Sequence, residues 1–299
     1  MKQFFKFMFA SFLGTLLTLL LVIFITIGTI SALVSMGEKK QVKLKENTVL
    51  LAKFDQPILD RSPLNPFENF DFMNFKTNEM LGLNDVLNNI EKASKDPNIK
   101  GIYMDLSELN AGMATVQEIR QKLEQFKLSG KFIITYSEGY SQAAYYLASV
   151  ADEIYLNPEG MILFKGLNSQ LAFLKGTLEK LEVEAQIVRG PNNKFKSAVE
   201  PLMYDKMSEA NREQMEKLLN SAWEEMINAV SKSRNIPIAE LQHIADELEL
   251  SNADKALELK FVDKLIYKDE MLALLKEKLG VEGDDKIQSV SLSKYTNAK

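Results

Sequence analysis

The chain has 299 residues, of which 46% are apolar, so it can bury a core in one large domain or two small ones. Its formal net charge is −5 with acidic and basic residues interspersed, which argues against the basic surface that holds nucleic acid. Cysteine is absent, which excludes thiol nucleophiles, disulfides and thiolate metal sites. We therefore expect a folded protein without a nucleic-acid partner.

The most distinctive segment is an uncharged apolar run over residues 7–34. About 20 apolar residues are enough for a helix to cross the hydrocarbon core of a bilayer, so this run predicts one transmembrane helix. A cleavable signal peptide is the alternative, but its apolar core usually has only about 7 to 15 residues. We interpret residues 1–36 as a cytoplasmic tail and an uncleaved membrane anchor in contact with the lipid bilayer.

Charge does not orient this anchor. Lys2 and Lys6 precede it, whereas four lysines follow it, at positions 39, 40, 43 and 45. An early span followed by a long folded domain is typical of a signal anchor, and large domains are translocated largely regardless of their charge. We therefore expect residues 46 onward to lie outside the cytoplasm.

After the anchor, short apolar runs alternate with longer amphipathic ones, which predicts an α/β fold. Thr115 and Glu118 have the spacing of a helix-capping box, and Gly130 is expected to end the same helix. Successive βα units predict a mainly parallel sheet with right-handed crossovers. The predicted strands are 48–54, 99–106, 131–137, 153–158 and 184–189; the predicted helices are 83–94, 115–127, 141–151, 171–181 and 208–232, with shorter ones after Pro237 and Asn252.

Two segments fall outside this alternation. Residues 57–75 predict an irregular loop with many apolar side chains, which covers a groove, a neighbouring subunit or its own core. Residues 281–299 are polar and predict a linker or a truncated end of the chain. The expected folded domain is therefore residues 46–280.

Three motifs resemble one known family. They are Tyr-Ser-Gln at 140–142 followed by Tyr-Tyr-Leu-Ala-Ser at 145–149, Asn-Pro-Glu-Gly at 157–160, and Lys-Ser-Ala-Val-Glu-Pro at 196–201. With these motifs, residues 46–270 resemble the first copy of the long, two-copy form of the signal peptide peptidase A (protease IV) family. A weaker likeness, at 256–265, departs from the pattern because Lys260 stands where a glycine is common.

The resemblance implies a serine-lysine dyad peptidase with a crotonase-like or Clp-protease-like fold, held in the inner membrane with its bulk on the periplasmic side. It implies that the enzyme degrades apolar signal peptides after their release and works as a homo-oligomer, a tetramer by the family pattern. It implies no cofactor and no metal. Extended peptides are expected to bind by adding a strand beside the sheet.

Lys196 falls on the family's general base. An exposed lysine has a pKa of about 10.4 and is protonated at neutral pH, but removal of water can lower a lysine pKa by several units. The neutral amine can then accept the proton of a serine hydroxyl. The apolar and small neighbours of Lys196 led us to expect an inward-pointing side chain there, with Lys194 in solvent.

The nucleophile is less clear, because Gln142 stands at the family's serine position and Ser141 lies one residue before it. In one interpretation, a second copy of the domain supplies the serine and this chain supplies Lys196. In another, Ser141 and Lys196 form a complete dyad, although a shift of one residue at a helix start turns a side chain by about 100°.

Two further interpretations are a membrane-anchored, non-catalytic scaffold of the same fold and an acyl-CoA enzyme, for which we find no thioester site. Among other residues, His243 is expected on a helix surface, and Trp223 in the core or an interface. Glu200 is expected either to orient Lys196 or to cap the next turn. Asp105 and Glu108 follow a strand end, but further groups for metal ligation are not evident.

Overall fold

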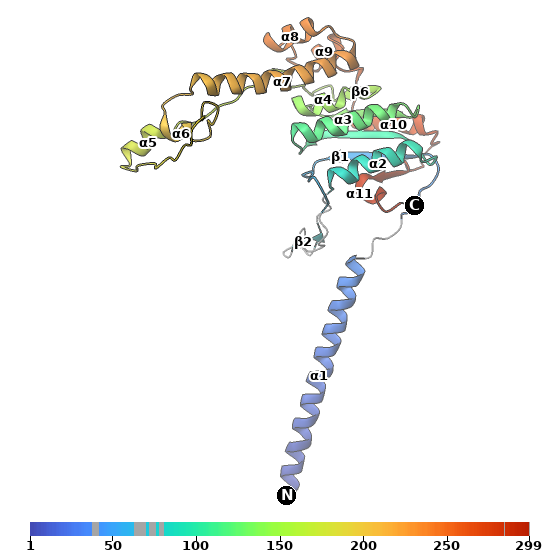
Figure 1. The fold of residues 1–299 in the computed structure, drawn as a ribbon. Coiled ribbons are helices and arrows are strands. Elements are labelled where there is room, and N and C mark those ends of the chain that lie inside the picture. Colours follow the sequence, from blue (N-terminus) through green and yellow to red (C-terminus); the bar gives the residue numbers. More distant parts are fainter. Residues whose placement is uncertain (38–41, 63–69, 72–75, 78–80, 284, 299) are drawn as a thin grey trace.

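A computed structural model describes residues 1–37, 42–62, 70–71, 76–77, 81–283 and 285–298. It has a long N-terminal helix, an α/β body and an arm that projects from the body (Figure 1). The strands are β1 Thr48–Phe54, β2 Phe70–Asp71, β3 Lys76–Thr77, β4 Ile99–Leu109, β5 Phe132–Ser137, β6 Glu153–Leu156, β7 Lys264–Leu265 and β8 Ser289–Ser291. The helices are α1 Lys2–Gly37, α2 Leu83–Lys95, α3 Met113–Lys127, α4 Gln142–Ala148, α5 Lys175–Lys180, α6 Glu200–Met203, α7 Glu209–Arg234, α8 Ile238–Asp246, α9 Ala253–Glu258, α10 Lys268–Leu279 and α11 Leu292–Tyr295.

The body is built on one sheet with the strand order β7-β6-β5-β4-β1-β8. Every neighbouring pair in it is parallel. Parallel strands need crossover connections, and helices α2, α3 and α4 provide them between β1, β4, β5 and β6. The predicted α/β fold with a mainly parallel sheet is confirmed.

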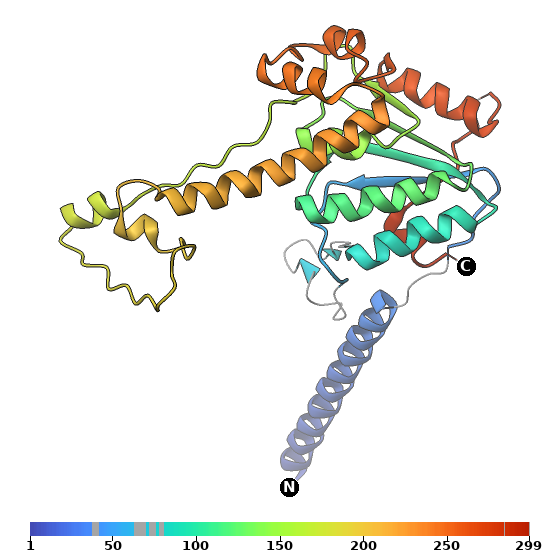
Figure 2. The same cartoon turned by 45° about the horizontal axis from the view of Figure 1, so that its top comes forward.

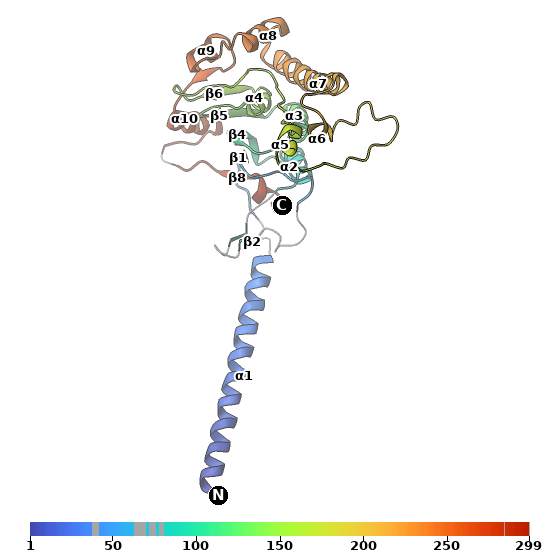
Figure 3. The ribbon, with the colours of Figure 1, turned by 90° about the vertical axis from the view of Figure 1, so that its left-hand side faces the viewer.

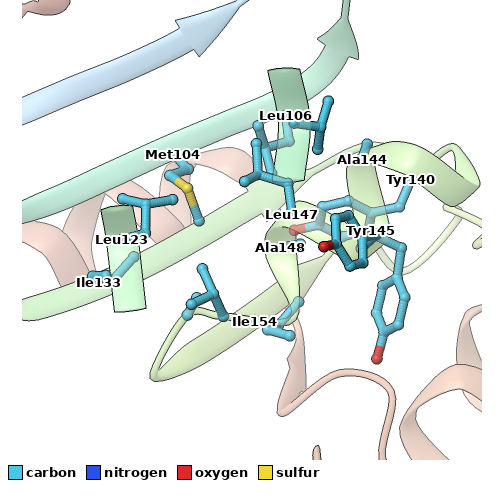
Figure 4. Close-up of a cluster of buried hydrophobic side chains, with 14 of the residues drawn as sticks. Met104, Leu106, Leu123, Ile133, Tyr140, Ala144, Tyr145, Leu147, Ala148 and Ile154 are labelled. Atoms are coloured by element: carbon cyan, nitrogen blue, oxygen red, sulfur yellow. The ribbon is translucent and has the colours of Figure 1, made fainter. Parts of the chain in front are cut away.

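Helices cover both faces of the sheet, as Figure 3 shows. On one face α2, α3 and α4 pack over a large apolar core, part of which is drawn in Figure 4 with Met104, Leu123, Ile133 and Leu147. On the other face α10 covers a smaller cluster that includes Tyr103 and Tyr136. Burial on both faces explains why β4 and β5 read as nearly continuous apolar runs in the sequence.

Helix α1 confirms one long apolar N-terminal helix. Its first 28 residues, Lys2–Thr29, have a mean hydropathy of 2.5, and their side chains are exposed. This length and composition are sufficient to cross a membrane. The predictions for Lys39, Lys40 and most of the 57–75 loop fall outside the described residues.

The predicted strand at 184–189 is wrong. These residues are irregular chain within the arm, and the side chain of Val188 is 98% exposed. A strand needs a neighbouring strand to satisfy its backbone groups, and this segment lies away from the sheet (Figure 2). Alternating apolar residues therefore did not identify a sheet strand here.

Two predictions at helix α3 need correction in detail. The helix begins at Met113 with Gly112 at its N-cap, so Thr115 lies inside the first turn and forms no capping box. The helix ends at Lys127, and Gly130 follows in the turn with a φ of +75°, a conformation that suits glycine.

The tail after residue 281 belongs to the fold, in contrast to the linker that its polarity predicted. Strand β8 adds to the sheet beside β1, and α11 follows it immediately. The buried side chain of Asn89 donates hydrogen bonds to the carbonyl of Leu292 (2.9 Å) and the hydroxyl of Thr296 (2.8 Å). Burial of Tyr295 adds an apolar contact, so this short polar segment is held by pairing and packing.

The arm comprises residues 165–208 and contains α5 and α6. It leaves the body after β6 and returns through α7, whose N-terminal end lies beside the arm and whose C-terminal end lies on the body (Figures 1 and 2). Leu174 donates a 2.7 Å backbone hydrogen bond to Pro201, and Lys175 pairs with Asp205 at 3.4 Å. The outgoing and returning segments of the arm are therefore joined.

Candidate active site

The start of α4 is the place where the sequence predicts catalytic chemistry. Strand β5 ends at Ser137, whose hydroxyl accepts a hydrogen bond from the amide of Gly139 at 3.1 Å. Tyr140 is buried and donates from its hydroxyl to the carbonyl of Tyr155 at 2.9 Å. These bonds fix the turn that leads from the carboxyl end of the strand into the helix.

Ser141 is the N-cap of α4. Its hydroxyl accepts a 3.2 Å hydrogen bond from the amide of Ala144, which satisfies one of the free amides at the helix start. The residue is exposed at the surface of the body. Capping accounts for a serine at this position without any catalytic function.

Gln142 is the first residue of α4, and its side-chain amide holds a second segment. The amide nitrogen donates to the carbonyl of Gly166 at 3.0 Å, and the amide oxygen accepts from the backbone amide of Lys165 at 2.8 Å. The Gln142 side chain therefore binds backbone groups of two adjacent residues, Lys165 and Gly166, at the beginning of the arm.

The Asn-Pro-Glu-Gly motif forms a turn beside this site. The amide of Gly160 donates to the carbonyl of Asn157 at 2.8 Å, and the amide of Asn157 donates to the carbonyl of Ser137 at 3.1 Å. A Cβ atom on Gly160 would lie 2.5 Å from the carbonyl oxygen of Glu138. Glycine is required here because the two backbones approach closely, and this contact holds the turn against the start of α4.

Lys196 lies on the arm, in the segment between α5 and α6. The guanidinium of Arg189 donates hydrogen bonds of 3.0 Å to the carbonyls of Asn193 and Lys196, which close this segment into a loop. The loop borders an open hollow of about 560 Å³, formed by residues 188–190 and 195–199. The expectation of an inward-pointing Lys196 is wrong for this chain, because its side chain is exposed.

The predicted pair, Ser141 and Lys196, is not brought together. Ser141 is on the body at the start of α4, whereas Lys196 is on the projecting arm (Figures 1 and 2). Lys194, for which we expected solvent exposure, is exposed, and its ammonium lies 4.9 Å from the ring centre of Phe195.

Glu200 binds the start of α7, where its carboxylate accepts from the amide and the hydroxyl of the N-cap residue Ser208. The residue is 2% exposed, and its carboxylate accepts hydrogen bonds from the hydroxyl of Ser208 (2.6 Å) and the side chain of Asn211 (2.9 Å). Burial by itself would raise the pKa of Glu200, but these bonds and the charge of Arg189 leave that pKa below its ordinary value. The glutamate therefore stays ionised at the N-terminal end of α7 and joins this helix to the arm.

Asp105 lies in the second half of β4, opposite Lys53 of β1, in an ion-pair cluster. Its carboxylate contacts the ammonium groups of Lys268 at 3.0 Å and Lys53 at 3.3 Å. Desolvation would raise the pKa of Asp105, but the two lysines and the Ser107 hydroxyl lower it overall. Glu108 is exposed, and the described residues contain no group of three or more His, Cys, Asp and Glu side chains that could hold a metal.

Other residues that the sequence singled out lie largely as expected. His243 is exposed on α8 and pairs with Glu249 at 3.3 Å. Trp223 packs against Phe164 with its ring 5.3 Å away and donates to Gln242 at 2.8 Å. Lys260 has a φ of +61°, which explains why a glycine suits that position.

Arg120 and the contacts of Gln142 were not predicted from the sequence. Arg120 follows Ile119 in the apolar stripe of α3, together with Val116 and Leu123, and a charge within such a stripe is the signal that could have identified it. The bonds of Gln142 to Lys165 and Gly166 cross more than 20 residues of sequence, and no local pattern indicates them.

Several known proteins are similar in sequence to this chain. The chain is 32% identical over 229 residues to "Serine protease SPPA, chloroplastic" of Arabidopsis thaliana, which covers 77% of this chain and 33% of that protein. It is 39% identical over 153 residues to "Protease 4" of Haemophilus influenzae, 51% of this chain and 25% of that protein. It is 34% identical over 204 residues to "Protease 4" of Salmonella typhi, 66% of this chain and 33% of that protein.

The matched regions thus span a quarter to a third of the length of these relatives. The sequence profile of peptidase family S49 matches residues 125–282, a stretch that includes α4, the whole arm and α7. This match covers more than half of the 299 residues and agrees with the resemblance carried by the motifs at 140–149, 157–160 and 196–201. The chain therefore belongs to peptidase family S49.

Proposed function

We propose that this chain supplies the general base, Lys196, of a membrane-anchored serine endopeptidase, and that a second S49 domain supplies the nucleophilic serine. The observation that supports this most strongly is the position of Lys196 on an arm that projects from the body, away from the start of α4. A base on a projecting arm is suited to reach a nucleophile on another domain. Gln142, at the start of α4 in this chain, cannot attack a carbonyl.

The proposed reaction uses a lysine as the base and a serine as the nucleophile. The neutral amine of Lys196 accepts the proton of the serine hydroxyl while the serine oxygen forms a bond to the carbonyl carbon of the peptide. The amine then returns the proton to the leaving nitrogen, the C–N bond breaks, and water later hydrolyses the acyl-enzyme ester. A lysine needs a lowered pKa to serve as a base at neutral pH, and a site from which water is excluded provides it.

The arm itself suggests how water would be excluded. Exposed apolar side chains are unusual in such density on a single short segment, and they mark a surface that docks against another protein surface. On the arm they are Leu167, Leu171, Leu174, Leu181, Val183, Val188, Phe195, Leu202 and Tyr204. We propose that a second S49 domain or a further subunit of a homo-oligomer covers this surface and buries Lys196.

Substrate class and location complete the proposal. Helix α1 would hold the protein in the inner membrane as a single span, with the body and arm on the periplasmic side. Released signal peptides, which are apolar and extended, would be available to an enzyme at that surface. The names "Protease 4" and "Serine protease SPPA" of the relatives support peptide hydrolysis as the reaction.

A complete dyad of Ser141 and Lys196 is the alternative within this chain. It would require the arm to fold back onto the body, and it would cost α4 the cap that the Ser141 hydroxyl provides at Ala144. A non-catalytic scaffold is the second alternative, and it gives no reason for a lysine in the Lys-Ser-Ala-Val-Glu-Pro motif.

Peptidase activity on an apolar, signal-peptide-like fluorogenic substrate distinguishes the three. Activity would be measured in detergent for residues 1–299 by themselves and for residues 1–299 mixed with a second S49 domain. Each measurement would be repeated with Lys196→Ala and, as a control, with Lys194→Ala. We expect activity only with the second domain, lost by at least about 10³-fold in Lys196→Ala and retained in Lys194→Ala. Activity of residues 1–299 alone that disappears in Ser141→Ala would establish the internal dyad, and inactivity in every combination would favour the scaffold.

A further inference from the structure

The segment that begins the arm runs alongside the turn before α4. The amide of Tyr140 donates to the carbonyl of Met161 at 2.9 Å, and the amide of Leu163 donates to the carbonyl of Tyr140 at 2.9 Å. These bonds form a parallel bridge between Tyr140 and Ile162, whose side chains are both buried. Residues 161–163 are therefore fixed to the body by backbone pairing.

Beyond this bridge, the side chain of Gln142 continues the pairing. Its amide accepts from the backbone of Lys165 and donates to the backbone of Gly166, so it replaces the two groups that a neighbouring strand would offer. Gly166 has a φ of +75°, and the chain turns there into the arm. Along this described segment, the bonds of Gln142 are the last hydrogen bonds to the body before the chain turns.

We infer that Gln142 is a positioning residue, which fixes the point and direction in which the arm leaves the body and thereby sets the place of Lys196. The inference rests on the proposed function in so far as it concerns Lys196. It also gives a physical reason for glutamine at this position, because a serine side chain is too short to bridge two peptide groups and offers one donor hydrogen.

The other end of the arm is held independently. Glu200 binds Ser208 and Asn211 at the start of α7, and α7 packs on the body. Loss of the Gln142 bonds would therefore leave the arm attached by α7 and free its outgoing segment. The expected consequence is a shift in the orientation of the Lys196 loop, without unfolding of the body.

Substitutions of Gln142 separate its two bonds. Gln142→Ala removes both. Gln142→Glu keeps the acceptor for Lys165 but, when ionised, cannot donate to Gly166 and places a negative charge near its carbonyl. Protonation of that glutamate, which takes place at about pH 4 to 5, restores the donor. Gln121→Ala on the exposed side of α3 is the matched control.

The first measurement is the mobility of a nitroxide spin label on the arm. The chain has no cysteine, so a single Ser169→Cys substitution gives one labelling site three residues beyond Gly166, and Glu118→Cys on α3 gives a reference site on the body. We expect Gln142→Ala to increase the mobility at 169 and leave that at 118 unchanged. In Gln142→Glu, the label at 169 should be mobile at pH 7 and recover its original spectrum near pH 4. Gln121→Ala should change the mobility at neither site.

The second measurement is activity in the presence of the second S49 domain. Misplacement of a base by about 1 Å can cost about 10²-fold in rate, so we expect Gln142→Ala to lower kcat by about 10- to 100-fold with KM changed less than about twofold. An unchanged label spectrum in Gln142→Ala would overturn the inference, even if Lys196→Ala abolishes activity. Full activity in Lys196→Ala would overturn the proposed function, while a mobile label would still support the positioning of the arm. If Gln142→Ala does not fold, the pH dependence of Gln142→Glu decides between these outcomes.

Discussion

The guanidinium of Arg120 on α3 donates a 2.6 Å hydrogen bond to the hydroxyl of Ser233 near the C-terminal end of α7. The same group donates to the carbonyl of Ala229 at 3.1 Å and lies 5.2 Å from the ring centre of Tyr146 on α4. A single side chain, 2% exposed, thus joins three helices where the C-terminal part of α7 packs on the body. Arg120 thus attaches α7, through which the chain returns from the arm, and Gln142 attaches the segment that begins the arm.

We expect Arg120→Ala to lower the free energy of unfolding by about 3 kcal/mol, because several charge-assisted hydrogen bonds and the packing of the aliphatic stem are lost together. Urea unfolding monitored by circular dichroism measures this change. Glu124→Ala is the control, since its carboxylate contacts Arg120 at 2.9 Å but is 42% exposed, and its loss should cost less than about 1 kcal/mol. Equal losses in both variants would mean that the surface ion pair, and not the buried contacts, stabilises this junction.

Removal of the Glu200 carboxylate should loosen the start of α7. Its oxygens accept bonds from the hydroxyl of Ser208 and the side chain of Asn211, and Glu200→Ala would leave the buried side-chain amide of Asn211 without this acceptor, at a cost of about 1 to 3 kcal/mol. Hydrogen exchange measures the effect locally, and we expect faster exchange in the first two turns of α7 with unchanged rates in the sheet. Glu213→Ala, an exposed position on the same helix, should leave exchange unchanged. Global acceleration in Glu200→Ala would contradict a local effect.

The ion pairs of Asp105 predict a pH dependence of stability. Because its folded-state pKa lies below the unfolded value of about 3.9, the stabilisation is complete above that value and is lost as the pH falls through the folded-state pKa. We expect Asp105→Asn to cost about 1 kcal/mol at pH 7, a modest value because both partner lysines are about half exposed, and to cost progressively less in acid. Unfolding free energies of both proteins from pH 2 to pH 7 test this. The exposed Asp55→Asn serves as the control, and a difference that stays constant with pH would contradict the ion-pair origin.

The C-terminal segment should contribute to the stability of the body. Asn89 on α2 is 4% exposed, and Asn89→Ala would remove the hydrogen bonds that its side chain donates to the carbonyl of Leu292 and the hydroxyl of Thr296. We expect a loss of about 1 to 2 kcal/mol and greater protease sensitivity of residues 285–298. The neighbouring Asn88 is exposed, and Asn88→Ala should change neither the stability nor the protease sensitivity. Unchanged protease sensitivity in Asn89→Ala would show that β8 pairing alone retains the segment.

Prediction from sequence succeeded where a local pattern and the tertiary environment agree. Strands β1, β4, β5 and β6 are buried on both faces, so their apolar runs identify them, and Ser208 and Asn252 mark helix starts by capping. Prediction failed where the presence or absence of a neighbouring strand decides whether a segment forms a strand. Residues 184–189 have the composition of a strand but no strand beside them in the arm, whereas the polar residues 289–291 become a strand because β1 offers an open edge.

The candidate site divides in the same way. The motifs around Ser141, Gly160 and Lys196 identified the family from short runs of sequence, because each motif is a local turn or helix start. The separation of Ser141 from Lys196 and the contact of Gln142 with Lys165 and Gly166 could not be predicted. They depend on where a 44-residue arm lies relative to the body, and this is set by contacts between segments far apart in the chain.

The sequence by itself determined the apolar N-terminal helix, the parallel α/β class and the membership of family S49, because hydrophobic periodicity and turn motifs are encoded in neighbouring residues. Only the tertiary structure decided that residues 165–208 form a projecting arm, that Glu200 binds the start of α7, and that β8 adds a strand beside β1. The physical reason is that hydrogen-bond partners and burial are properties of the assembled chain, and a residue's own neighbours in sequence do not specify them.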